Sequence, residues 1–150
     1  MNWLLDTNLV LRFSDKRSAV HQTACQSLDS LFTRGESLHI TAQNLIEFWA
    51  VATRPIEANG LGWTCDDTDA WITHLLTRLL FLRDSERVFS EWRSLTAGLA
   101  IKGKKVHDAR LAAVMKAYNI THLLTFNTGD FARFAGIRAV HPDDVLAGRV

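Results

Sequence analysis

The chain has 150 residues, a length typical of one domain with a core of its own. Hydrophobic residues make up 47% and charged residues 22%, and the formal net charge of +1 creates no overall field that would attract nucleic acid. Cys25 and Cys65 are too few and too far apart for a disulfide framework or a zinc site, which fits a reducing cytoplasm. We therefore expect a single domain over residues 1–150, cytoplasmic and soluble, with neither a signal peptide nor a membrane span.

The chain opens on a short apolar run that ends at a carboxylate. Residues 3–5 have the pattern of a buried strand, and Asp6 follows them directly. An acid at the carboxyl end of such a strand lies where open α/β sheets place their ligand crevices. Asp6 is equally a good N-cap for the helix expected over residues 9–13, so its position alone leaves both interpretations open.

Strands and helices alternate along the rest of the chain. Apolar spacing predicts helices over residues 19–34, 43–53, about 64–79, 86–100 and 106–115. Shorter apolar runs predict strands at 37–41, 80–82, 122–126 and 137–140. Strands separated by helices point to an α/β protein with three α/β/α layers and a central, mainly parallel sheet.

Two of these helices carry informative patterns. Residues 43–53 are apolar nearly all round, which predicts a buried helix, and Glu47 is its only charge. Glu47 has no cation three or four residues away, so a role toward a ligand is favoured over a place on a solvent stripe. In the helix over 86–100, the apolar side is expected to consist of Val88, Phe89, Trp92, Leu95 and Leu99.

The helix expected over 106–115 presents an acid on its inward face. Asp108 lies three and four residues before Leu111 and Ala112, which belong to the buried stripe. The helix dipole favours an acid in the first turn, but it does not explain this inward placement. The cations around Asp108 form either a solvated face or a guide for a phosphate backbone; they are Lys102, Lys104, Lys105, Arg110 and Lys116.

The last long strand also ends in polar residues, Asn127 and Asp130. In a parallel sheet, Asp6 and Asn127 belong to the same edge, and two helix starts can bring Glu47 and Asp108 alongside. Carboxylates held together repel one another and need a compensating cation, and Mg²⁺ or Mn²⁺ prefers oxygen ligands of this kind. Such an ion can activate a water molecule for attack on a phosphodiester. The five residues are therefore candidate metal ligands.

Other chemistries find less support. The six histidines show no paired metal spacing, no glycine-rich phosphate loop follows a strand, and no serine stands in a nucleophile elbow. A metal-dependent phosphatase built on Asp6 remains an alternative, although Asn8 stands where that pattern would want a second acid.

The motifs resemble those of PIN-domain ribonucleases over essentially the whole chain, through residues 5–8, 44–47, 106–110 and 124–131. More closely, residues 52–55, 59–62 and 91–93 are similar to one branch of the VapC-like toxins of bacterial toxin–antitoxin pairs. The resemblance implies a PIN-like fold and a Mg²⁺- or Mn²⁺-dependent endoribonuclease in the bacterial cytoplasm. It also implies a homodimer and a small cognate antitoxin as partner.

The resemblance assigns roles residue by residue. The acidic metal-site positions fall on Asp6, Glu47 and Asp108. The supporting polar positions fall on Thr7, Asn8 and Thr125.

One position departs from the family pattern. Many PIN domains have a fourth acid where Asn127 stands, and the neutral Asn127 is a weaker cation ligand. Asp130, three residues further on, is the candidate substitute, directly or through water. The departure also keeps open a catalytically weakened PIN-like module that binds RNA or protein.

Overall fold

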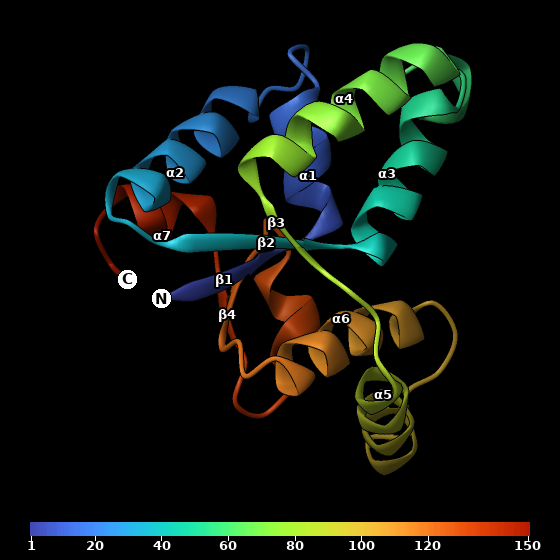
Figure 1. Cartoon of the computed structure of the whole chain (residues 1–150), viewed down its shortest axis with the longest axis vertical. Coiled ribbons are helices and arrows are strands. Elements are labelled where there is room, and N and C mark those ends of the chain that lie inside the picture. Colours follow the sequence, from blue (N-terminus) through green and yellow to red (C-terminus); the bar gives the residue numbers. More distant parts are fainter.

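The computed structural model describes all residues from 1 to 150 and contains a five-stranded sheet between two layers of helices (Figure 1). The strands are β1 (Asn2–Leu5), β2 (Ser37–Thr41), β3 (Leu80–Leu82), β4 (His122–Leu124) and β5 (Arg138–Val140). Their order in the sheet is β3-β2-β1-β4-β5, and every neighbouring pair is parallel. The predicted three-layer α/β/α architecture is confirmed.

Seven α-helices cover the two faces of the sheet: α1 (Thr7–Ser14), α2 (His21–Thr33), α3 (Ala42–Thr53), α4 (Cys65–Arg78), α5 (Glu86–Gly98), α6 (Lys105–Ala117) and α7 (Pro142–Leu146). Two short 3-10 turns, η1 (Ile56–Ala58) and η2 (Thr128–Phe131), complete the secondary structure. In Figure 1, α1 to α4 and α7 lie above the sheet, and α5 and α6 lie below it. None of the helices combines the length and the apolar character that crossing a membrane requires.

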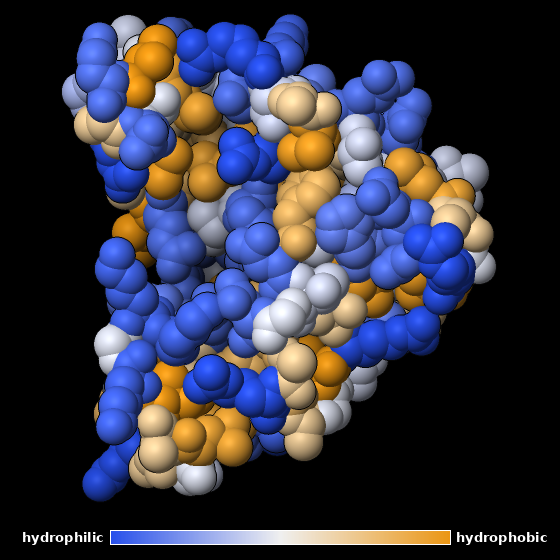
Figure 2. Space-filling view, turned by 180° about the vertical axis from the view of Figure 1, so that it is seen from behind, coloured by the Kyte–Doolittle hydropathy of each residue, from blue (hydrophilic) through white to orange (hydrophobic).

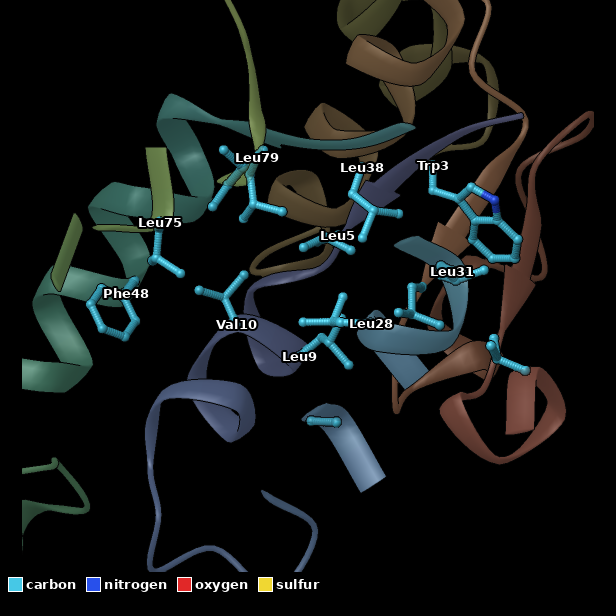
Figure 3. Packing of buried hydrophobic residues seen from close by; sticks show 14 of the residues in the cluster. Trp3, Leu5, Leu9, Val10, Leu28, Leu31, Leu38, Phe48, Leu75 and Leu79 are labelled. Carbon is cyan, nitrogen blue, oxygen red and sulfur yellow. The ribbon is translucent and has the colours of Figure 1, made fainter. Parts of the chain in front are cut away.

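Alternation along β1 builds a core on each face of the sheet. Trp3 and Leu5 belong to the larger apolar cluster, which also contains Leu9, Leu28 and other side chains from the upper helical layer (Figure 3). Leu4 points the other way, into the cluster between the sheet and α6. Each fully buried side chain of this size contributes about 1.5–3 kcal/mol. The strand that leads to Asp6 is therefore held from both sides.

The predicted burial of the helix over residues 43–53 was wrong in part, and the predicted apolar side of the helix over residues 86–100 is only partly covered. On α3, Phe48 is fully buried, but the side chain of Ile46 is 69% exposed, because α3 contacts α1, β2 and α4 and nothing covers its outer side. On α5, Val88 is buried against α6, whereas Phe89 is 62% and Leu99 43% exposed. Helical periodicity identifies an apolar face, but it does not say whether a neighbour covers the whole of it.

Several element ends differ from the prediction in ways that matter for the site. β4 ends at Leu124 rather than at residue 126, because the backbone N–H of Phe126 donates to the Asn8 side chain instead of continuing the ladder. α6 begins at Lys105, so this lysine belongs to the first helical turn and not to the preceding loop. The predicted cap of α3 is present, and Thr41 forms a capping box with Asn44.

Candidate active site

Asp6 lies at the carboxyl end of β1 and is almost completely buried, with 8% of its surface exposed. Its Oδ1 accepts a hydrogen bond from the backbone N–H of Thr7 at 2.7 Å, so Asp6 caps α1. Its Oδ2 accepts from the Thr125 hydroxyl at 2.7 Å and from the Asn8 amide at 3.1 Å. The two interpretations of Asp6 are therefore compatible, because one oxygen caps the helix while polar side chains hold the other.

Asn8 and Thr125 connect the ends of β1 and β4. The Asn8 amide donates to Thr125 Oγ1 at 3.2 Å, and its carbonyl oxygen accepts from the backbone N–H of Phe126 at 3.2 Å. The backbone N–H of Asp6 donates to the carbonyl of Leu124 at 3.0 Å. The orientation of Asp6 is thus set by the register of two parallel strands, as the predicted common edge requires.

Glu47 approaches the same edge from α3 and is held by neutral donors. Thr7 Oγ1 donates to Glu47 Oε2 at 2.7 Å, and Gln43 Nε2 donates to Glu47 Oε1 at 2.8 Å. Asn44 Nδ2 in turn donates to Thr7 Oγ1 at 3.1 Å, which orients the hydroxyl toward the carboxylate. These bonds leave Glu47 without a cation partner in the structure.

Gln43 is a positioning residue that sequence reasoning missed. Its side chain is buried, and Nε2 donates both to Glu47 and to the backbone carbonyl of His107 at 2.9 Å, which joins α3 to the first turn of α6. Its Oε1 accepts from Arg110 at 3.0 Å. The available signal was its place one helical turn before Glu47, as a polar residue on the same face of the helix.

Lys105 lies within ion-pair distance of both Asp108 and Asp130. Lys105 Nζ donates to Asp130 Oδ1 at 2.6 Å and lies 3.7 Å from Asp108 Oδ2. The side chain of Asp108 is 27% exposed, consistent with its expected inward placement at the start of α6. The structure therefore places Lys105 inside the acidic group.

The carboxylates lie close enough to affect each other's ionisation. Burial raises the pKa of Asp6 from 3.8 to about 6 against the lowering effect of its hydrogen bonds from Thr125 and Thr7, and repulsion from Asp108 and Glu47 raises it further. Burial also raises the pKa of Asp108, opposed by the positive charge of Lys105 and assisted by Asp130 and Glu47. The site therefore stores repulsion that a cation would relieve.

The other candidate residues are more peripheral. The side chain of Asn127 is exposed, and only its backbone N–H reaches the site, donating to Thr125 Oγ1 at 3.0 Å. Lys102 and Lys104 are exposed in the segment before α6. Arg110 donates to Asp84 at 2.7 Å and to Gln43 at 3.0 Å, and to none of the candidate acids.

The chemistry of the donors fits a hard divalent cation. No three His, Cys, Asp or Glu side chains lie close enough together to form a ready-made cage for an ion. Mg²⁺, however, is usually bound through one or two carboxylates and keeps several waters, so it does not require such a cage. All the converging donors are oxygens, and the ammonium of Lys105 already lies between two of the acids. In Figure 2, the molecule is hollowed on the left side, where hydrophilic residues gather.

Fold and site together define an α/β/α protein with an acidic, oxygen-rich centre at the carboxyl edge of a parallel sheet. The family model of the PIN domain matches residues 3–137, a range that contains every residue of this centre. The chain belongs to the PIN domain family. No curated protein matches it in sequence.

Solved structures share this fold along almost their whole length. Rickettsia felis VapBC2, bound to a DNA fragment from its promoter, has a TM-score of 0.73 at 19% identity, covering 94% of this chain and 98% of that one. DNA-bound VapBC from Salmonella typhimurium has a TM-score of 0.70 at 18% identity, with coverages of 95% and 98%. Mycobacterium tuberculosis VapC20, a sarcin-ricin loop cleaving toxin, has a TM-score of 0.65 at 18% identity, with coverages of 91% and 98%. At these identities the likeness is one of fold.

Proposed function

We propose that this protein is a Mg²⁺- or Mn²⁺-dependent endoribonuclease and the toxin of a bacterial toxin–antitoxin pair, acting in the cytoplasm. The observation that supports it best is the convergence of Asp6, Glu47 and Asp108, whose mutual repulsion calls for a cation, in a chain of the PIN family. Oxygen donors and a phosphodiester substrate are the natural partners of such an ion.

In this proposal, Asp6 and Asp108 hold the ion, and Glu47 and Asp130 complete the site directly or through water. Bound there, such an ion would lower the pKa of a water molecule and neutralise charge on the phosphate. Hydrogen bonds from neighbouring side chains keep metal-binding carboxylates oriented, and both Asp6 and Glu47 accept such bonds. Those donors are Thr125 and Asn8 on Asp6, and Thr7 and Gln43 on Glu47.

The substrate is held by groups outside the acidic centre. The exposed Lys102 and Lys104 precede α6, whose first turns carry Asp108, so they are available to a phosphate backbone approaching the site. Arg110 donates hydrogen bonds to Asp84 and Gln43, so its proposed role is to position these two side chains. No side chain is required as the nucleophile.

The test is cleavage of RNA by the purified protein with and without divalent ions. We expect cutting only with Mg²⁺ or Mn²⁺, its loss on chelation, and near-complete loss in Asp108→Asn with an unchanged circular dichroism spectrum. Full activity in excess chelator would contradict the metal mechanism. Turnover of p-nitrophenyl phosphate without RNA cleavage would favour the phosphatase. RNA binding without any turnover would favour the catalytically weakened module.

The role as a toxin is tested in cells. The fold is that of the toxins found in VapBC complexes, and exposed apolar side chains such as Ile46 and Phe81 leave surface for an antitoxin and a second copy of the chain. Brief expression should arrest growth and create new RNA ends, and Asp6→Ala should do neither. Co-expression with the product of the adjacent gene should restore growth, and sedimentation of the purified protein should give the mass of a dimer.

A further inference from the structure

An open pocket of about 320 Å³ lies between the start of α5 and α6, and Arg110 in its lining also donates to Gln43. We call it the α5 pocket. Its lining consists of Asp84, Ser85, Val88, Phe89, Trp92 and Arg110. None of these residues except Arg110 contacts a residue of the acidic centre or its supports through a side-chain hydrogen bond.

The apolar wall of the α5 pocket is a pair of stacked aromatic rings. The rings of Phe89 and Trp92 have centroids 5.8 Å apart and planes inclined by 29°. Trp92 is fixed, because its Nε1 donates to the backbone carbonyl of Val106 at 2.9 Å. Phe89 is nevertheless 62% exposed. The exposed side chain of Phe89 is therefore available for contact with a further planar group.

The polar wall carries opposite charges that cancel. Arg110 Nη2 donates to Asp84 Oδ2 at 2.7 Å, while Arg110 Nη1 donates to Gln43 at 3.0 Å. Asp84 is 48% exposed, and its Oδ1 makes no hydrogen bond within the protein, so it can accept one from a ligand. A neutral pocket with an aromatic face and one free acceptor suits a planar heterocycle with N–H groups better than it suits a phosphate.

The α5 pocket is joined to the acidic centre by a chain of hydrogen bonds. Arg110 donates to Gln43, and Gln43 donates to Glu47 at 2.8 Å. Two side-chain hydrogen bonds therefore separate the pocket wall from a carboxylate of the site. A nucleic acid strand with a phosphate at the acidic centre would have a nearby base within reach of this pocket.

We propose that the α5 pocket binds an unpaired base of the RNA, close to the cleaved phosphodiester, by stacking it on Phe89. This rests on the ribonuclease function proposed above and adds a base-binding pocket beside the acidic centre. Proteins read unpaired RNA by stacking splayed-out bases on aromatic side chains and hydrogen-bonding their edges. The pocket offers both kinds of contact.

The experiment measures binding in EDTA, so that cleavage does not interfere. The probes are fluorescein-labelled hexaribonucleotides of one sequence, intact or with a single abasic position moved along the chain, and the readout is fluorescence anisotropy. Phe89→Leu keeps an apolar side chain without the ring, and Phe89→Tyr keeps the ring. Leu99→Ala, an exposed apolar residue at the other end of α5, is the matched control.

We expect Phe89→Leu to weaken binding of the intact hexamer by about five- to 100-fold, the range for loss of one stacked base. Phe89→Tyr and Leu99→Ala should bind like the wild type. One abasic position should weaken wild-type binding and have no further effect in Phe89→Leu. This coupling identifies the base that Phe89 holds.

An unchanged affinity of Phe89→Leu, or an abasic penalty that persists in that variant, overturns the proposal. A change in its sedimentation coefficient without a change in RNA affinity also overturns it, and assigns the pocket to a protein interface. Binding in EDTA does not depend on turnover, so the two proposals fail separately. Metal-dependent cleavage without coupling between Phe89 and an abasic position would contradict only the base-binding pocket. Such coupling without cleavage would contradict only the nuclease function.

Discussion

Lys105 donates a hydrogen bond to Asp130 at 2.6 Å while its ammonium lies 3.7 Å from Asp108. The hydrogen bond that Lys105 donates to Asp130 and the negative charges of both acids raise the pKa of Lys105. The lysine therefore compensates two of the acids that are proposed to meet a divalent cation. The basic residue and the ion compete for the same oxygens.

Replacing Lys105 by methionine should strengthen divalent binding, because the ion no longer displaces an ammonium from Asp108 and Asp130. We expect the Kd for Mn²⁺, measured by calorimetry on the metal-free protein, to fall by about five- to tenfold, a change of about 1–1.4 kcal/mol. Lys102→Met is the matched control, since Lys102 is exposed nearby and has no ion pair. An equal or weaker affinity in Lys105→Met would show that Lys105 does not occupy the ion's place.

Asp108→Asn should raise the melting temperature of the metal-free protein. Burial and the repulsion from Asp130 and Glu47 outweigh the attraction of Lys105, as the raised pKa of Asp108 indicates, so its charge costs stability. We expect a rise of about 2 °C, measured calorimetrically, for roughly 0.5–1 kcal/mol in a chain of this size. Saturating Mg²⁺ should reduce or reverse the difference, because the wild type gains more from binding. A lower melting temperature both with and without the ion would make Asp108 a purely structural residue.

Asp6 should make the stability of the metal-free protein depend on pH. Its pKa is raised from 3.8 to about 6, so the folded state binds the proton more tightly, and the stabilisation present below pH 3.8 is lost as pH rises through about 6. The full loss is about 3 kcal/mol for two pKa units. Urea unfolding of wild type and Asp6→Asn from pH 4 to 7 measures it. The stability of the wild type relative to the variant should fall over this interval, and a constant difference would refute the shift.

Thr7→Val should impair the site without unfolding the protein. The hydroxyl of Thr7 donates to Glu47 and accepts from Asn44, and valine keeps the shape of the side chain while removing both bonds. Loss of such an outer contact typically costs 10–100-fold in metal affinity or activity, so RNA cleavage should fall by about that factor. Thr7→Ser keeps the hydroxyl and should retain most of the activity. Equal rates for the two variants would exclude the hydroxyl from positioning Glu47.

Local sequence patterns are enough to single out the candidate acids. Asp6 follows a buried strand, Glu47 is the only charge in an apolar helix, and Asp108 lies on the buried stripe of another helix. Each pattern depends on residues within one or two turns, and the parallel order of the strands then brings their carboxyl ends to one edge. The sequence by itself therefore determined the fold class and the candidate acids.

Only the tertiary structure decided which side chains meet across the fold. The charge of its segment predicts either a solvated face or a phosphate-backbone contact for Lys105, but Lys105 contacts Asp130, 25 residues away. Gln43 bonds to the backbone of His107, 64 residues away, and no local pattern marks that pair. The exposure of Phe89 likewise depends on how α6 packs against α5. Periodicity records the chemistry of one face of an element, whereas contact and exposure depend on the elements packed against it.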